Sequence, residues 1–396
     1  MILLFPMQNK AFSFFLILMM AFHGISHAQY NDSSQIYSIK TGPGKVLKAF
    51  SGMPETNISW FTSFEYGKKG NGKHEWQKML GYPEYGLEVV YGDLNNDFLG
   101  NMFAMQPFIR IPVMKNKKKW RVSITAGMGF AYFDNPYHFF DNPENGLIGC
   151  GLNNYTKGEF EIGYVIGEQW RMFGSVGAFH FSNAHVKLPN IGANVPEVKI
   201  GVTWLQNQND MIENKIYPSI DSTWSLHIRY GTGFHAYGST MKPFNGPVYP
   251  VYSLSVGSGK NLSAVYAVSF GATVGYYRSF NNFLLSEMLL EENEAFFKST
   301  YASVYFGQEM MLGKFAVYGE CAVDIAKPFL RQYGDIFDQQ KGITGFIKQI
   351  NSNRLGLRYY LKEINQKHNW NINLGLFIKS NFAQADFVEC AVQVKL

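Results

Sequence analysis

Charge is the first thing that this sequence has little of. Asp, Glu, Lys and Arg make up 16% of its 396 residues, whereas soluble domains average about 25%. The net charge of +5 is too small to point to a nucleic-acid partner. A hydrophobic fraction of 46% excludes a disordered chain. The composition therefore fits neither an ordinary soluble enzyme nor a polar binding tail.

Cysteines and the familiar enzyme motifs are also scarce. Cys150, Cys321 and Cys390 are the three cysteines, and they lie far apart without the spacing of a metal site or a disulfide framework. No GxSxG, HExxH, Walker or GxGxxG motif occurs. The sequence therefore predicts no cofactor and no metal.

Long apolar runs are limited to one segment near the start, Ala11 to Phe22. Its 12 residues are too few to span a bilayer as a helix. Lys10 precedes the run, and Ser26-His27-Ala28 follows it with small residues at the positions that a signal peptidase reads. We therefore expect residues 1–28 to be a signal peptide that is cleaved after Ala28.

Aromatic residues, glycines and a period of two are what the chain has in quantity. Apolar and polar residues alternate along Trp120–Phe130, Trp370–Lys379 and Val388–Leu396, as they do in a strand with two different faces. Such segments are about 9–11 residues long, which is enough to cross a bilayer at a tilt. A soluble sandwich would have shorter strands, near five or six residues. The stretch Leu284–Lys298 lacks the alternation and predicts a helical or irregular excursion within a loop.

These patterns together favour an all-β fold, an antiparallel transmembrane β-barrel. We expect about 12–14 strands, because single-chain bacterial barrels have even numbers. Residues 29–396 are predicted to form one barrel domain, which places the protein in the outer membrane of a Gram-negative bacterium.

One stretch carries a pattern that suggests chemistry, within residues 179–194. On a strand His180 and Ser182 point to the same face, with Cα atoms about 6–7 Å apart. That spacing suits a serine nucleophile and its general base, although a purely structural pair fits it as well. The alternation leaves open whether this face points to lipid or to the barrel interior.

The motif resembles that of a known family. His180-Phe-Ser-Asn-Ala184, followed by Pro189-Asn-Ile-Gly192, is similar to the active-site block of the outer-membrane lipid A 3-O-deacylases (PagL), a group also called acyloxyacyl hydrolases. Looser similarity covers Gly127–Ala131, Asn142–Asn145, Gly151–Asn154 and Phe382–Phe387. The resemblance implies an outer-membrane serine esterase that removes an ester-linked 3-hydroxyacyl chain from lipid A of lipopolysaccharide. It further implies that Ser182 is the nucleophile, that His180 is the general base, and that Asn183 and Asn190 are the amides around the oxyanion.

Two departures from the family pattern keep other interpretations open. Where the family has a glutamate that orients the histidine, this chain has Asn194. Either Glu197, Glu159 or Glu161 takes over that role, or a dyad works with Asn194, or the enzyme is impaired. The chain is also more than twice as long as the compact deacylases, so residues from about 210 onward either enlarge the barrel or serve another purpose. The alternatives are a non-catalytic structural or binding barrel and a porin-like channel.

Overall fold

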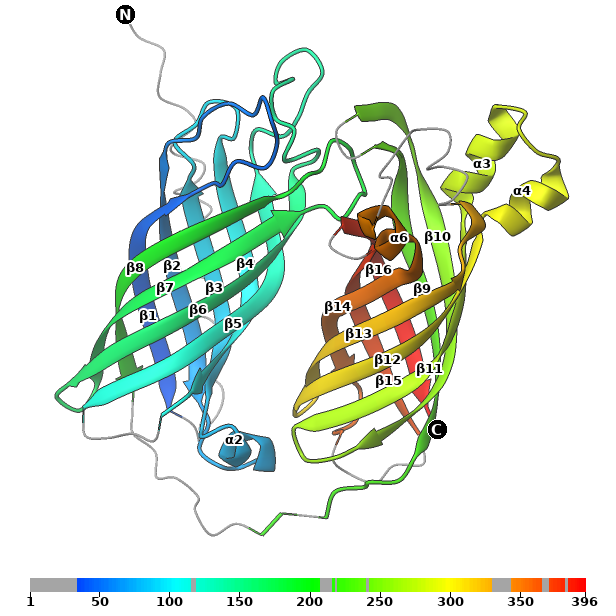
Figure 1. Cartoon of the computed structure of the whole chain (residues 1–396). Coiled ribbons are helices and arrows are strands. Elements are labelled where there is room, and N and C mark those ends of the chain that lie inside the picture. Colours follow the sequence, from blue (N-terminus) through cyan, green and yellow to red (C-terminus); the bar gives the residue numbers. More distant parts are fainter. Residues whose placement is uncertain are drawn as a thin grey trace, which may run out of the picture.

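A computed structural model describes residues 34–114, 119–206, 216–217, 219–239, 242–329, 343–364, 370–381 and 384–396. Within these ranges the chain forms two antiparallel β-barrels, each closed on itself, which follow one another along the sequence (Figure 1). The antiparallel transmembrane-type barrel predicted from the alternation is confirmed. The expected signal peptide, residues 1–28, lies outside the described residues.

The first barrel consists of eight strands in sequential order. They are β1 (Gln35–Lys45), β2 (Ile58–Lys69), β3 (Glu84–Asp93), β4 (Asn101–Pro112), β5 (Trp120–Phe133), β6 (Leu152–Ile166), β7 (Trp170–Ser182) and β8 (Ala193–Gln206). β8 closes the barrel against β1, with Lys40 opposite Gly201.

The second barrel has the same number of strands and the same sequential order. They are β9 (Ser225–Ser239), β10 (Lys242–Asn261), β11 (Tyr266–Tyr277), β12 (Thr300–Leu312), β13 (Phe315–Ala326), β14 (Asn351–Tyr360), β15 (Asn371–Asn381) and β16 (Gln384–Lys395). β16 closes this barrel against β9, with Val392 opposite Tyr230.

The expectation of one barrel with 12–14 strands is therefore wrong. Gly42-Pro43-Gly44 interrupts the alternation of β1, so the pattern does not predict this strand. Alternation also reports only which face of a strand is apolar, and says nothing of the partner with which the strand pairs. The closing pairs join residues more than 150 positions apart, which no local pattern reveals.

The interior of the first barrel holds an apolar cluster that includes Phe61 and Phe181, together with charged side chains that pair with one another. Lys40 Nζ lies 2.7 Å from Glu65 and 2.5 Å from Glu159, with all three side chains fully buried. Arg110 contacts Glu65 at 2.7 Å. Eight strands leave an interior just wide enough for side chains. This packing argues against the porin-like channel.

The outer surface is apolar, as expected for strands that face lipid. Met172, Val176 and Ile200 are more than half exposed, whereas Arg171 and Phe173, on the two sides of Met172 in the chain, point inward. At one end of β7, Trp170 lies beside Trp204 with ring centroids 6.3 Å apart. Aromatic residues at strand ends are typical of the girdles of outer-membrane barrels.

The loops at the two ends of the first barrel differ in length. At the lower end in Figure 1, β6 and β7 are joined by three residues, although residues 70–83 join β2 and β3 at that end as well. The longest connection of the first barrel, residues 134–151, lies at the upper end. Outer-membrane barrels have short turns on the periplasmic side and longer loops outside. On the basis of this longest connection we expect the upper end to lie in the outer leaflet.

Short helices lie in the connections between strands. They are α2 (Glu75–Met79), α3 (Arg278–Ser286), α4 (Glu292–Lys298) and α6 (Ile343–Ile350). The helical excursion predicted for Leu284–Lys298 is confirmed by α3 and α4. Within the described ranges no helix combines the length and the apolar character that a membrane crossing requires.

Candidate active site

His180 and Ser182 lie at the upper end of β7, on the outer face of the first barrel. They continue the outward row that contains Met172, Gly174 and Val176. β7 has 13 residues, so Ser182 is about 40 Å along the strand from its lower end. The face that the sequence left open is therefore the lipid side. Ser182 itself is only 4% exposed, because the loop that follows it covers the end of the strand.

Asn194 is hydrogen-bonded to His180 in this structure. The two residues are directly opposite in the pairing of β7 with β8, and Asn194 Oδ1 lies 2.9 Å from His180 Nδ1. A carbonyl oxygen accepts only, so Nδ1 carries the proton and Nε2 presents its lone pair. No hydrogen bond among the described residues uses His180 Nε2 or Ser182 Oγ.

The three glutamates considered as substitutes point to the other side of the sheet. Glu159 and Glu197 are buried inside the barrel, where Glu159 binds Lys40 and Glu197 lies 2.6 Å from Lys199. Glu161 binds Arg110. All three serve the interior ion pairs, and the wall of the barrel separates them from His180.

Gly192 packs so closely against His180 and Ser182 that no side chain fits at this position. A Cβ atom at this position would lie 2.9 Å from Ser182 Cβ, 3.0 Å from His180 Cε1 and 2.8 Å from the Phe181 carbonyl oxygen. Its φ of +71° also favours glycine. Gly192 belongs to the motif, but its spacing alone does not predict that it packs against both side chains.

Asn183 and Asn190 hold the loop between β7 and β8 together. The Asn183 backbone N–H donates to Asn190 Oδ1 at 3.0 Å, and the Asn183 side chain donates to the Lys187 carbonyl oxygen at 2.8 Å. No hydrogen bond among the described residues uses Asn190 Nδ2. Of the two amides expected around an oxyanion, Asn190 Nδ2 is thus the one with a free donor, while Asn183 orders the loop.

Two further polar residues share this outer face. Asn154 pairs with Ser182, and Thr156 pairs with His180, across β6 and β7. Thr156 Oγ1 donates to Asn154 Oδ1 at 2.8 Å. Sequence analysis missed them as site residues, because the register that places them beside the motif exists only in the folded sheet.

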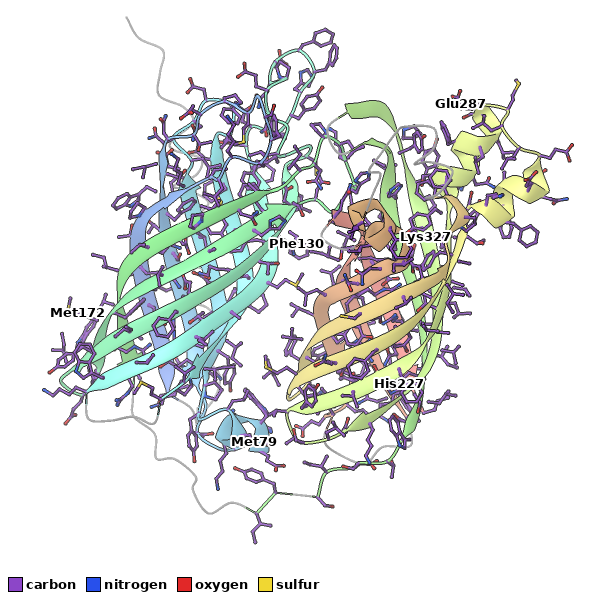
Figure 2. All side chains as sticks on the ribbon, viewed as in Figure 1. Met79, Phe130, Met172, His227, Glu287 and Lys327 are labelled. Carbon is purple, nitrogen blue, oxygen red and sulfur yellow. The ribbon has the colours of Figure 1, made fainter. Side chains whose placement is uncertain are left out.

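An apolar surface continues downward from the site. Below His180 the outer face carries Ala178, with Gly158 and Pro196 on its two sides. Further down lies a groove of about 520 Å³. Its outward side chains include Ile162, Tyr164, Met172, Ile200 and Val202. Figure 2 shows Met172 projecting from the outer surface near the lower end of the barrel.

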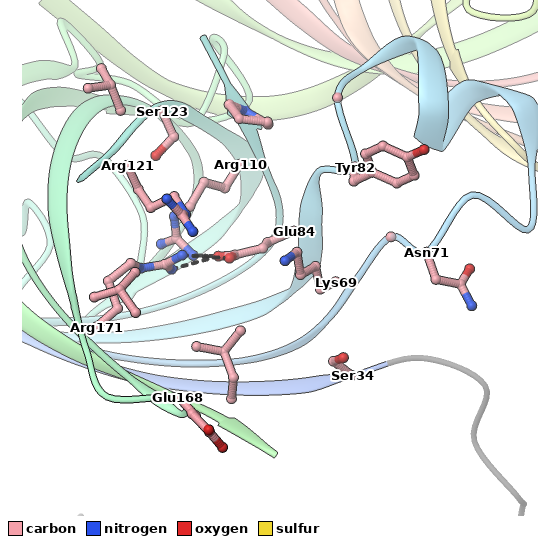
Figure 3. A pocket seen from close by; sticks show the side chains of 16 residues that line it. Ser34, Lys69, Asn71, Tyr82, Glu84, Arg110, Arg121, Ser123, Glu168 and Arg171 are labelled. Atoms are coloured by element: carbon pink, nitrogen blue, oxygen red, sulfur yellow. Dashed lines mark hydrogen bonds and ion pairs between the residues drawn. The ribbon is translucent and has the colours of Figure 1, made fainter. Parts of the chain in front are cut away.

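The interior of the first barrel contains a polar cavity that is separate from the candidate site. A cavity of about 180 Å³ opens at the lower end of the first barrel, far from Ser182. Its centre is occupied by ion pairs, in which Arg171 binds Glu84 at 2.6 Å and Arg110 binds it at 3.0 Å (Figure 3). Within the described part of the chain, no group of three His, Cys, Asp or Glu side chains is placed to hold a metal ion.

Comparisons with known proteins give a family match over part of the chain. Residues 62–203 match the family model described as Lipid A 3-O-deacylase (PagL). Among solved structures, the outer membrane enzyme PagL is 17% identical, with 42% of this chain and 98% of that chain covered and a TM-score of 0.31. A triple mutant of the Rhodopseudomonas blastica porin is 9% identical, with coverage of 92% and 100% and a TM-score of 0.18. No curated protein matches the chain.

The matched residues begin in β2 and end in β8, so they lie within the first barrel. With its closed barrels and apolar outer surface, the chain is an outer-membrane β-barrel protein, and its resemblance to the lipid A 3-O-deacylase (PagL) family is confirmed over residues 62–203.

Proposed function

We propose that the first barrel is a serine-dependent hydrolase that removes an ester-linked 3-hydroxyacyl chain from lipid A. The observation that carries this proposal is the hydrogen bond from His180 to Asn194 on the lipid-facing side, beside Ser182. It supports a neutral imidazole with its basic nitrogen free. A general base of this kind activates a serine hydroxyl for attack on an ester.

The steps follow from the atoms present. His180 Nε2 removes the proton from Ser182 Oγ while the oxygen attacks the ester carbonyl carbon. The Asn190 side-chain amide is the donor placed in the loop to stabilise the oxyanion that forms. His180 then returns the proton to the leaving alcohol oxygen of the lipid, and an acyl-enzyme remains. Water, activated by the same nitrogen, releases the fatty acid.

Asn194 supplies orientation without charge. An asparagine holds the neutral imidazole in the required tautomer, as in Cys-His-Asn proteases. It does not neutralise the imidazolium that forms during the reaction, so this enzyme is expected to be slower than a relative with a carboxylate in this place.

The position of the site supports a lipid substrate. Ser182 lies at the end of the strand assigned to the outer leaflet, where lipopolysaccharide resides. The small residues Gly158 and Ala178 and the apolar groove below them offer an acyl chain a path along the outside of the barrel. A substrate already in the membrane reaches this site without leaving it.

Mass spectrometry of lipid A from cells that express the protein tests the proposal. We expect wild type to remove the mass of one 3-hydroxyacyl chain, and Ser182→Ala and His180→Ala to leave lipid A intact. Ser175→Ala is the matched control, because Ser175 lies on the same strand and faces the interior. If well-folded wild type leaves lipid A unchanged, the barrel is a non-catalytic structural or binding protein.

A further inference from the structure

The loop that follows Ser182 is attached to the second barrel through one residue, His185. The His185 ring stacks on the ring of His235 in β9, with centroids 4.8 Å apart and planes 16° from parallel. Its Nε2–H donates to the Gly238 carbonyl oxygen at 3.3 Å. Its own carbonyl oxygen accepts the Ala236 N–H at 2.9 Å. Three contacts thus join one loop residue to the upper end of β9.

His185 is buried and uncharged in this position. It is 6% exposed, and burial lowers the pKa of its imidazole, although Asp386 and the bond to Gly238 act in the opposite direction. A neutral ring stacks on His235 without repulsion between charges. The contact is therefore suited to a permanent attachment at neutral pH.

The backbone of the loop needs such an attachment. Ala184 and His185 both have positive φ, +48° and +66°, which L side chains adopt rarely and at an energetic cost. Such conformations persist where the surrounding structure holds them. The first barrel holds the far end of the loop, where Ile191 and Gly192 donate to the Gly146 and Leu147 carbonyl oxygens. The second barrel holds the near end.

The β9 side of the contact is itself fixed. His235 Nδ1 lies 2.9 Å from Ser279 Oγ at the start of α3, and its ring meets Phe280 edge-on at 5.1 Å. The ring that supports His185 is thus held by its own barrel. Movement of the loop end would require His235 to leave this packing.

We infer that the second barrel positions the catalytic loop, and that His185 is the positioning residue through which it acts. This inference rests on the proposed function, because the loop matters for catalysis only if Ser182 and Asn190 react with and stabilise a substrate. A displacement of about 1 Å in a catalytic group can cost about 100-fold in rate. The second half of the chain thereby gains a role that the compact deacylases do not need.

Kinetic measurements on the full-length protein test the inference. His185→Gly tolerates the positive φ and removes the ring contacts, so kcat is expected to fall about tenfold, which corresponds to about 1.4 kcal/mol. KM should change less than twofold, because the acyl groove is untouched. His185→Asn keeps an amide donor and tolerates positive φ, so part of the activity should return. His227→Gln is the matched control: His227 is a buried histidine at the lower end of the same strand, hydrogen-bonded to Ser225 at 2.9 Å.

Amide hydrogen exchange provides a readout that does not depend on activity. In His185→Gly the amides of residues 183–192 should exchange at least tenfold faster than in wild type, and in His227→Gln they should not. Unchanged exchange and unchanged kcat in both His185 variants, with Ser182→Ala inactive, would overturn the positioning role and leave the hydrolase standing. If wild type releases no acyl chain, the proposed function is wrong, and so is the role of His185 in positioning the catalytic loop. The exchange data then still show whether His185 couples the barrels.

Discussion

Replacing Gly192 with alanine places a methyl group against Ser182 and His180, the proposed nucleophile and general base. The new Cβ would lie 2.9 Å from Ser182 Cβ and 3.0 Å from His180 Cε1, whereas carbon atoms pack at about 3.5–4.0 Å. The pair must therefore separate or shift by about 0.5–1 Å. A displacement near 1 Å can cost about 100-fold, so we expect kcat for lipid A deacylation to fall about 100-fold. The positive φ adds a loss of stability of about 1–2 kcal/mol.

A second glycine separates these two effects. Gly167, in the turn between β6 and β7, has φ +66° and no atom within 4 Å of its would-be Cβ. Gly167→Ala should therefore lose similar stability in urea unfolding and keep its rate. Initial rates on purified protein in mixed micelles with lipopolysaccharide, with folding checked by heat-dependent gel mobility, provide the comparison. Wild-type kcat in Gly192→Ala would refute the placement of the reaction beside Gly192.

Three more predictions follow from the same geometry. Asn194→Ala removes one hydrogen bond worth about 1 kcal/mol and should slow deacylation about fivefold, whereas Asn194→Glu should speed it. Equal rates of deacylation in wild type and both variants would exclude position 194 as the orienting group. Gly158→Trp fills the outer face below His180 and should raise KM for long acyl chains, while Gly319→Trp, on the open outer face of the second barrel, should not. Glu84→Gln leaves Arg171 without its buried carboxylate partner, so the free energy of unfolding should fall by about 3–5 kcal/mol. Urea unfolding measures this as a lower midpoint, and an unchanged midpoint would contradict a stabilising role for the interior ion pairs.

The class of fold was readable from the sequence because its signal is local. Apolar and polar side chains alternate along most of β5 and β15. A period of two indicates a sheet with one lipid-facing side. The helical segment at 284–298 was readable for the same reason. The number of barrels was not, since closure depends on pairs such as Lys40 with Gly201 and Val392 with Tyr230. Nothing in the neighbourhood of these residues distinguishes two closures of eight strands from one larger ring.

The candidate site divides in the same way. His180 and Ser182 are two residues apart, so their common face followed from strand geometry alone. Asn194 was identified by its place in the motif. Whether Asn194 or one of Glu159, Glu161 and Glu197 lies beside His180 depends on the strand register, which the sequence does not reveal.

What the sequence alone determined is therefore everything with a short range: the strand period, the aromatic and weakly charged composition, and the His-x-Ser spacing. Tertiary structure decided the rest. In the folded protein His180 and Ser182 face lipid, and Gly192 packs against both of them. The end of β9 contacts His185, although the two are about 50 residues apart in the chain. The physical reason is that sheet register and barrel closure are set by the packing of many distant side chains together, and no single segment of the sequence carries that information.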